Sequence, residues 1–282
     1  MKSSSLEFLC CPACHADLLL ENAGVRHDIE TGRLKCLECS KVYPIQDGLP
    51  RFAARQELIG KNRNQYWLGN IYSHFYDQIV VKPMMLFFGV QEEEGRREYL
   101  SGLEIIKNAK VLEIAVGPGP NIPYLYQMIE GAEVYGLDLS IGMLHQCAEN
   151  LKRWSLEAEL FQGLAEQLPF KDNTFDVVFQ VGGINDFRDK QRAIEEMLRV
   201  AKPGTKIIVV DEWLHPQREK RLLGRLVLRA LPVLYRRTEP PTDLLPATVE
   251  EARLEPIWKG YGYCLAFRKP GARVGAESPA DN

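Results

Sequence analysis

Four cysteines near the start of the chain have the spacing of a metal site. Cys11 and Cys14 form one C-x-x-C pair and Cys36 and Cys39 form a second, with twenty-one residues between the pairs. Each pair can present two thiolates from one tight turn, and two pairs complete the tetrahedral four-sulfur shell of a structural zinc ion. Four thiolates leave no open coordination position, so this zinc would stabilise a small domain rather than catalyse a reaction.

Two neighbouring residues compete for the same ligand positions. Cys10 would change the first spacing to C-x-x-x-C, and His15 would duplicate a position already filled. The other use of a C-x-x-C pair is redox chemistry, which needs an adjoining thioredoxin-like strand and helix that this sequence does not predict. A segment of about fifty residues buries too little apolar surface to fold alone, which again favours a metal. We therefore expect a zinc ribbon over residues 1–52.

The ribbon segment, with the letters FLCCPACHADLLLE and RLKCLECSKVYPIQDGLPRF, resembles the small zinc-ribbon proteins that bind and activate methyltransferases. The likeness extends to the closing phrase from Tyr43 to Pro50. In such relatives the ribbon works by contact with a methyltransferase. The resemblance thus implies a protein contact for this ribbon, with the rest of the chain or with a second protein.

A second group of residues with chemical potential surrounds a glycine turn. An apolar run from Val111 to Val116 leads into Gly117-Pro118-Gly119, and after a helical stretch a second apolar run ends in Asp138. Glycines let the backbone approach a ligand closely, and an acid at the tip of the second strand can accept both hydroxyls of a ribose. The pattern predicts a nucleotide-binding site at the ends of two parallel strands.

The elements that would position this site alternate between strands and helices. Further apolar strands are predicted in 156–163, 175–183 and 205–213, with a pair near 258–267. Such alternation predicts an α/β fold with a mostly parallel, Rossmann-like sheet and helices on both faces.

The expected domain organisation has four parts. The zinc ribbon is followed by a helical lid or linker over 53–106 and by the core over 107–270, with an insertion at about 213–250. The last residues, 271–282, have the composition of a disordered tail.

The core phrases VLEIAVGPGPN, YGLDLS, GLAEQLPFKDNTFDVVF and EMLRVAKPGTKIIVVDE resemble class I S-adenosylmethionine-dependent methyltransferases, nearest to the quinone-biosynthesis and small-molecule group. The resemblance implies a seven-stranded sheet and S-adenosylmethionine as cofactor. Glu113 would be the acid at the end of the first strand, Asp138 would bind the ribose and Met143 would pack against the adenine. The full set of implied cofactor-binding residues is Glu113, Ala115, Val116, Gly117, Gly119, Asp138, Leu139, Met143, Leu164, Ala165 and Gln180.

The chain departs from the family pattern at two of these positions. Ala115 stands where the family has the first motif glycine, and Leu164 stands where an aspartate is common. The Ala115 methyl group would narrow the space beside the methionine part of the cofactor.

The methyl acceptor is predicted less directly. Residues 66–89 are rich in aromatic residues and Met, which suits a small lipophilic or aromatic acceptor. A general base would make a phenol or an activated ring carbon more nucleophilic by removing its proton, but methyl transfer requires no fixed triad of catalytic residues. His74, Tyr76 and Asp186 are the first candidates because they border the expected acceptor pocket, although each has a purely structural alternative.

A basic, leucine-rich stretch at 217–237 carries seven Lys and Arg and one acid. Interpreted as one helix ending at Pro232, it could lie on an anionic membrane surface or cover a lipophilic substrate. The alternative is a helix that packs on the core with a solvated cationic face.

Composition excludes some classes of function. The chain has 282 residues, with 35 Lys and Arg against 38 Asp and Glu and a formal net charge of −3, so a general nucleic-acid binder is not expected. No secretory signal and no membrane-spanning run of about 18 apolar residues is present, which predicts a cytoplasmic protein, at most peripheral at the membrane. A zinc-ribbon RNA methyltransferase and a non-catalytic partner protein with this fold remain the alternatives.

Overall fold

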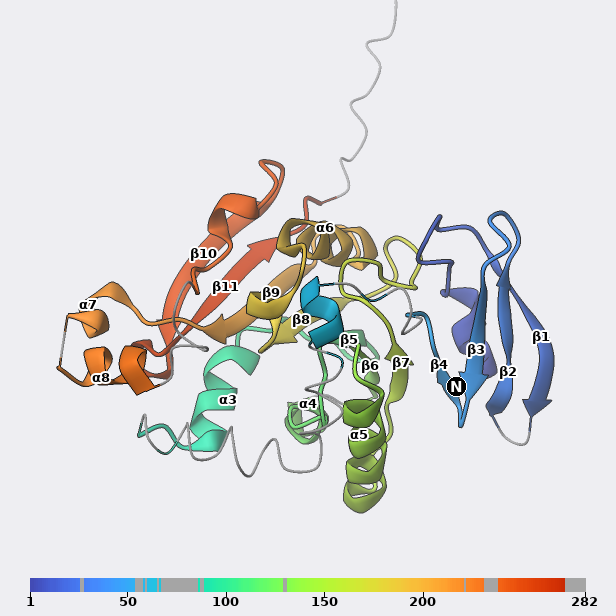
Figure 1. The fold of residues 1–282 in the computed structure, drawn as a ribbon, viewed down its shortest axis with the longest axis horizontal. Coiled ribbons are helices and arrows are strands. Elements are labelled where there is room, and N and C mark those ends of the chain that lie inside the picture. The colour runs from blue at the N-terminus through green and yellow to red at the C-terminus, as the bar shows by residue number, and fades with distance from the viewer. Residues whose placement is uncertain are drawn as a thin grey trace, which may run out of the picture.

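A computed structural model of the chain places the ribbon and the core side by side (Figure 1). The structure describes residues 1–25, 28–53, 58, 60–64, 66, 86, 89–128, 131–220, 222–230 and 238–271. Most of the predicted lid, with His74 and Tyr76, lies outside the described residues.

The N-terminal domain is a four-stranded antiparallel sheet in the order β1-β2-β3-β4. Its strands are β1 (Leu18–Val25), β2 (Ile29–Cys36), β3 (Val42–Gln46) and β4 (Leu49–Pro50), preceded by a 3-10 turn over Ser3–Glu7. Alternate residues of β2 and β3 are buried, among them Leu34, Tyr43 and Ile45. One buried face is the expected pattern for a small sheet whose other face meets water.

The core is a seven-stranded sheet in the order β10-β11-β9-β8-β5-β6-β7. Strands β5 to β9 are parallel to one another. Strand β11 is antiparallel to β9, and the edge strand β10 is antiparallel to β11. The bounds are β5 (Lys110–Ile114), β6 (Glu133–Asp138), β7 (Glu159–Gln162), β8 (Val177–Val181), β9 (Lys206–Glu212), β10 (Glu250–Ile257) and β11 (Gly262–Arg268).

Helices cover both faces of this sheet (Figure 1). Helices α3 (Glu92–Leu100), α4 (Ile122–Met128) and α5 (Ile141–Trp154) pack on one face, while α6 (Lys190–Val200) packs on the other. The two shorter helices α7 (Pro216–Glu219) and α8 (Leu222–Ala230) follow β9. The predicted fold class is confirmed.

The ribbon shares an apolar core with the α6 face of the large sheet. Phe8, just after the 3-10 turn, packs edge to face on Tyr135 of β6 with ring centroids 5.2 Å apart. The ring centroids of Phe170 and Phe175 lie within 6.3 Å of the ring centroid of Phe8. Aromatic contacts of this kind add to the large area that the rings bury, so the ribbon is docked by hydrophobic packing.

Backbone hydrogen bonds extend this contact at two places. The N–H of Cys10 donates to the carbonyl of Pro169 (3.0 Å), and the N–H of Lys171 donates to the carbonyl of Phe8 (2.8 Å). At the other end of the ribbon, the N–H of Phe52 donates to the carbonyl of Gln162 at the end of β7 (2.8 Å). The ribbon therefore contacts its own core on both sides of the segment 163–168.

Two details differ from the sequence prediction. The last hairpin begins at Glu250 rather than near Trp258, which instead starts the turn between β10 and β11. The basic stretch forms two helices because the chain turns at Lys220, and residues 231–237, which include the expected stop at Pro232, lie outside the described residues. Among the described helices, none combines the length and the apolar character needed to cross a bilayer.

Candidate cofactor and metal sites

The four predicted cysteine ligands come together at one end of the ribbon. One ligand atom from each of Cys11, Cys14, Cys36 and Cys39 lies within 4.8 Å of all the others. The Sγ atoms of Cys11 and Cys39 are 3.6 Å apart and those of Cys14 and Cys36 are 3.5 Å apart. Tetrahedral coordination with Zn–S bonds of about 2.3 Å requires sulfur separations close to these, so the donor set fits zinc.

The competing ligands point elsewhere. Cys10 is fully buried and its backbone joins the ribbon to Pro169, while the Nε2 of His15 lies 3.8 Å from a carboxylate oxygen of Glu196 on α6. Tyr43 supports the cluster, because its hydroxyl lies 3.1 Å from the Sγ of Cys11.

The glycine turn and Asp138 meet at the ends of β5 and β6. One carboxylate oxygen of Asp138 accepts from the N–H of Gly117 at 2.9 Å, and the other accepts from the N–H of Ser140 at 2.8 Å. Withdrawal of the carboxyl group from water raises the pKa of Asp138 to about 6, against the opposing effect of these donors. Asp138 is thus held rigidly at the strand tip with lone pairs left for a ligand.

Behind the turn, Glu113 is the end of a buried polar chain. Its Oε1 accepts from the side-chain amide of Asn121 at 2.6 Å, and the Oδ1 of Asn121 accepts from both Arg96 and Tyr99 of α3. Burial raises the pKa of Glu113 to about 8. The second oxygen, Oε2, has no hydrogen-bond partner among the described residues, so it is available to a donor from a bound molecule.

A cleft that is partly open to solvent lies beside Asp138 at the carboxyl ends of β5 and β6. Its lining comes from the ends of both strands, from the loop after β7 and from one aromatic ring: Ile114, Ala115, Leu137, Asp138, Leu139, Gly163, Leu164, Ala165, Glu166 and Phe187. A mainly aliphatic cleft with the acids Asp138 and Glu166 in its wall suits a nucleoside, with the base against the aliphatic side and the ribose at Asp138.

Five of the predicted cofactor residues line this cavity: Ala115, Asp138, Leu139, Leu164 and Ala165. Gly117 borders open space, since an added Cβ would meet nothing within 4 Å. Together with the unpartnered oxygen of Glu113, this space fits a ligand that extends from the cavity along the glycine turn.

Other predicted residues lie around the site rather than in the cavity wall. A Cβ on Gly119 would come within 2.6 Å of the Sγ of Cys147, so this glycine allows α5 to pack closely. Val116 packs against Gly136, Met143 is buried on the first turn of α5, and Gln180 is buried at the end of β8. Their role toward a cofactor remains a prediction.

The two departures from the family pattern both occur in the cavity wall. Ala115 has a φ of +57°, a left-handed conformation that favours glycine. Ala115 is one of the residues that line the cavity. Leu164 also lines the cavity and presents an apolar side chain where an aspartate would offer a hydrogen bond.

Sequence reasoning missed two residues that shape the cavity. Glu166 is buried and accepts from the backbone N–H groups of Arg188 (3.0 Å) and Asp189 (3.4 Å), which brings the loop after β7 against the start of α6. Phe187, just before that helix, supplies the aromatic ring of the cavity wall. An acid four residues after a strand gives no local signal for this contact.

Asp186 is the one candidate base that the structure describes. It ends the 3-10 turn Ile184–Asp186 and directly precedes Phe187, which lines the cavity; its role as a base stays a prediction. Partial burial and the nearby Asp211 raise the pKa of Asp186, while Lys61 and Lys190 oppose the shift. Asp211 fixes this turn, because its carboxylate accepts from the N–H groups of Gly183 and Asn185 at 3.1 and 2.9 Å.

The fold and site define a Rossmann-like α/β domain with a cleft at the carboxyl ends of two parallel strands, preceded by a four-cysteine ribbon. The methyltransferase domain family matches residues 112–209, and the Trm112p-like protein family matches residues 2–48. A demethylmenaquinone methyltransferase of Streptomyces avermitilis is 31% identical over 169 residues, which is 59% of this chain and 70% of the relative. The chain belongs to the class I S-adenosylmethionine-dependent methyltransferases, with a Trm112p-like ribbon at its N-terminus.

Other comparisons agree on the fold. A demethylmenaquinone methyltransferase of Renibacterium salmoninarum is 33% identical over 151 residues, and the chain spans 60% of that relative's length. One chain of a solved complex between the Haloferax volcanii Trm112 methyltransferase activator and a protein proposed to be a methyltransferase superposes with a TM-score of 0.54. That match has 13% identity and covers 72% of this chain and 97% of the other, so it shows the likeness in fold alone.

Proposed function

We propose that this protein transfers the methyl group of S-adenosylmethionine to a small lipophilic acceptor of the quinone type. The observation that carries the proposal is the cleft at the ends of β5 and β6, with Asp138 fixed in its wall by Gly117 and Ser140. Relatives named demethylmenaquinone methyltransferases support the class of acceptor, and about a third of the aligned residues are identical to this chain.

The residues of this chain would bind and orient both reactants. Asp138 would accept the ribose hydroxyls, and Leu139, Leu164 and Ala165 would hold the base on the apolar side. Glu113 and the open turn at Gly117 would face the amino-acid part. When bound, S-adenosylmethionine supplies a methyl group that leaves the sulfonium sulfur as the acceptor's electron pair attacks, and the S–C bonding pair stays on sulfur.

Asp186 would take the proton that a phenol or ring carbon loses during this displacement. Its raised pKa makes Asp186 a stronger base than an ordinary aspartate. Asp211 positions the turn that carries Asp186, and Phe187 next to it keeps water away from the cleft. Catalysis would depend mainly on this positioning, since the donor is already activated.

The ribbon would bind zinc through its four cysteines and support its own core. Its contacts hold both ends of the segment 163–168, and residues 163–166 of that segment line the cleft. We infer that the ribbon supports its own core in the way that separate zinc-ribbon proteins support their partner methyltransferases.

Two measurements test the proposal. Calorimetric titration with S-adenosylmethionine should give saturable binding of one equivalent per chain, and its absence would favour a non-catalytic partner protein. Transfer of labelled methyl groups should then occur to a demethylated naphthoquinone dispersed in lipid, and not to total RNA. Label in RNA instead would support the zinc-ribbon RNA methyltransferase.

A further inference from the structure

Helix α8 exposes leucines and arginines together on one face. Leu222 is 77% exposed and Leu226 is 53% exposed, and Arg225 and Arg229 are exposed beside them. At 3.6 residues per turn, these four positions fall within an arc of about 100° on the helix. Two apolar and two cationic side chains therefore point away from the protein in the same direction.

The opposite face of α8 is the one that docks on the core. Val227 is 1% exposed and belongs to the same apolar cluster as Ile257, Trp258 and Tyr261. Gly224 allows close contact with α7, because a Cβ there would come within 2.0 Å of the carbonyl oxygen of Arg218. This docked face fixes the direction in which the leucines and arginines point.

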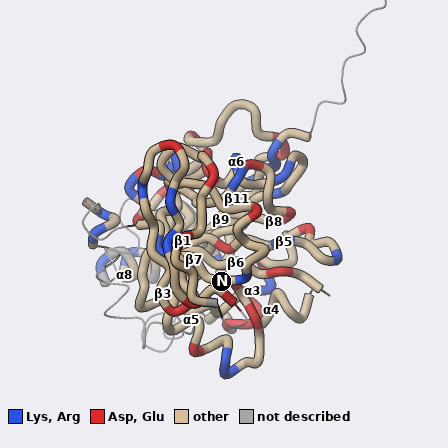
Figure 2. Tube along the Cα trace, turned by 90° about the vertical axis from the view of Figure 1, so that its right-hand side faces the viewer, with Lys and Arg blue, Asp and Glu red and all other residues tan. Residues whose placement is uncertain are grey.

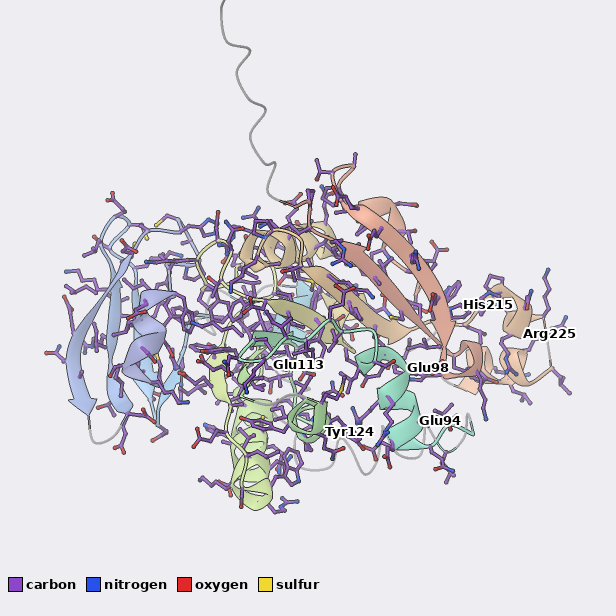
Figure 3. The ribbon with its side chains drawn as sticks, turned by 180° about the vertical axis from the view of Figure 1, so that it is seen from behind. Glu94, Glu98, Glu113, Tyr124, His215 and Arg225 are labelled. Atoms are coloured by element: carbon purple, nitrogen blue, oxygen red, sulfur yellow. The ribbon has the colours of Figure 1, made fainter. Side chains whose placement is uncertain are left out.

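Neighbouring segments extend the same surface. The side chain of Arg218 donates to the carbonyl of Lys259 at 2.7 Å, and the ammonium group of Lys259 donates to the carbonyl of Gly89. Gly89 closes a turn with Leu86, whose side chain is 80% exposed. Arg225 and His215 mark this end of the molecule in Figure 3, away from Glu113.

Charge sets this surface apart from the rest of the chain. Residues 216–230 contain five basic residues and one acid, in a chain with a formal net charge of −3. On the ribbon side of the molecule, by contrast, both signs are interspersed along the trace (Figure 2). We call the exposed residues of this region the α7–α8 patch: Lys220, Leu222, Arg225, Leu226 and Arg229.

We propose that the α7–α8 patch docks this protein on an anionic phospholipid surface. Arginines there can pair with phosphate groups while the leucines between them enter the boundary with the acyl chains, which is how interfacial helices bind. A second copy fits less well, since a two-fold contact would place the same cations against each other. RNA fits less well because it offers nothing to the leucines.

This proposal rests on the proposed function in one respect: docking on a membrane would give the enzyme access to an acceptor dissolved there. Binding to lipid is measured without any turnover. A protein that binds vesicles but not S-adenosylmethionine would refute the proposed function and leave the docking surface standing, and the reverse result would refute the docking surface alone.

Co-sedimentation of the full, zinc-loaded chain with vesicles tests the proposal. The protein should pellet with vesicles of phosphatidylcholine and phosphatidylglycerol, should stay in solution with phosphatidylcholine alone, and should be released by added salt. The double variant Arg225→Gln/Arg229→Gln should bind roughly 25-fold more weakly, at about fivefold per charge. Leu222→Ser/Leu226→Ser should lose at least tenfold, because both side chains would leave the lipid.

Matched controls carry the same changes elsewhere. Lys152→Gln/Arg153→Gln in the last turn of α5 removes two cations, and Leu19→Ser removes an exposed leucine of the ribbon. Both should bind vesicles like the unchanged protein. Equal loss in the controls, or no loss in the patch variants, would overturn the proposal. Concentration-dependent dimers that the leucine variant abolishes, without vesicle binding, would identify a second copy as the occupant.

Discussion

The side-chain amide of Gln162 links Leu139 to the end of the ribbon. Its Nε2 donates to the carbonyl of Leu139 at 3.2 Å, and its Oε1 accepts from the N–H of Ala53 at 3.1 Å. Gln162 is fully buried and Leu139 lines the cleft beside Asp138. One side chain therefore joins the exit of the ribbon to the wall of the cofactor cleft.

Replacing Gln162 by leucine should weaken both the fold and cofactor binding. The change keeps the approximate volume but leaves the Ala53 N–H and the Leu139 carbonyl without partners, at about 1–3 kcal/mol for each buried group. Denaturant unfolding should show this loss, and calorimetry should show a higher Kd for S-adenosylmethionine. Gln146→Leu, which removes an amide from the partly exposed side of α5, should change neither by more than about 0.5 kcal/mol.

Zinc removal should reduce cofactor affinity although the metal lies outside the cleft. A chelator, or Cys36→Ser, should unfold the ribbon and release both of its contacts around 163–168. A loss of about tenfold in affinity is expected, within the usual range of coupling between two sites. Cys264→Ser serves as control, because this thiol is outside the cluster. Unchanged affinity in the metal-free protein, with the ribbon shown to be unfolded, would contradict the coupling.

Ala115→Gly should stabilise the protein slightly and tighten cofactor binding. The left-handed φ of +57° is unfavourable for alanine by about 1 kcal/mol or more, which exceeds the entropy that glycine adds to the unfolded chain. The net gain should be roughly 0.5 kcal/mol in thermal unfolding, with a lower Kd from the wider cleft. Ala165→Gly removes a methyl group from the same cleft without a positive φ, and it should not stabilise.

Glu113 should make the protein less stable as the pH rises. Its pKa is raised to about 8 in the folded chain, so between its ordinary pKa of about 4.5 and pH 8 the folded state holds a proton that the unfolded state has lost. The free energy of unfolding therefore falls across that range, by an amount on the order of a few kcal/mol. In Glu113→Gln this part of the pH dependence should vanish. A variant that keeps the same slope would show that Glu113 is ionised in the folded protein.

Much of the fold followed from local patterns. Two C-x-x-C pairs, a glycine turn between apolar runs and an acid after the second run each specify short-range geometry, and the structure brings those residues together as expected. The parallel sheet followed from the alternation of strands and helices. Ala115 and Leu164 both line the cleft, and their effect on cofactor binding stays a prediction.

The missed features depend on contacts between distant segments. Gln162, Glu166 and Phe187 act through partners 20 or more residues away, which no spacing rule reports. The docking of Phe8 into the large sheet depends on the matching of two domain surfaces. The split of the basic stretch into two helices was missed because the residues around the turn, Arg218 to Lys220, include no Gly or Pro to mark it. The close approach at Gly224 is visible only in three dimensions.

The most direct test of the account is calorimetric titration of S-adenosylmethionine into the unchanged protein and into Asp138→Asn across pH 5 to 8. Because the pKa of Asp138 is about 6, the affinity of the unchanged protein should fall below that pH, by up to about tenfold per unit, as the carboxylate that accepts the ribose hydroxyls is protonated. Asp138→Asn should bind more weakly at pH 8 and show no such dependence, while Asp172→Asn on the surface should behave like the unchanged protein. Equal, pH-independent binding by the Asp138 variant, or no binding by the unchanged protein, would contradict a cofactor site at this cleft.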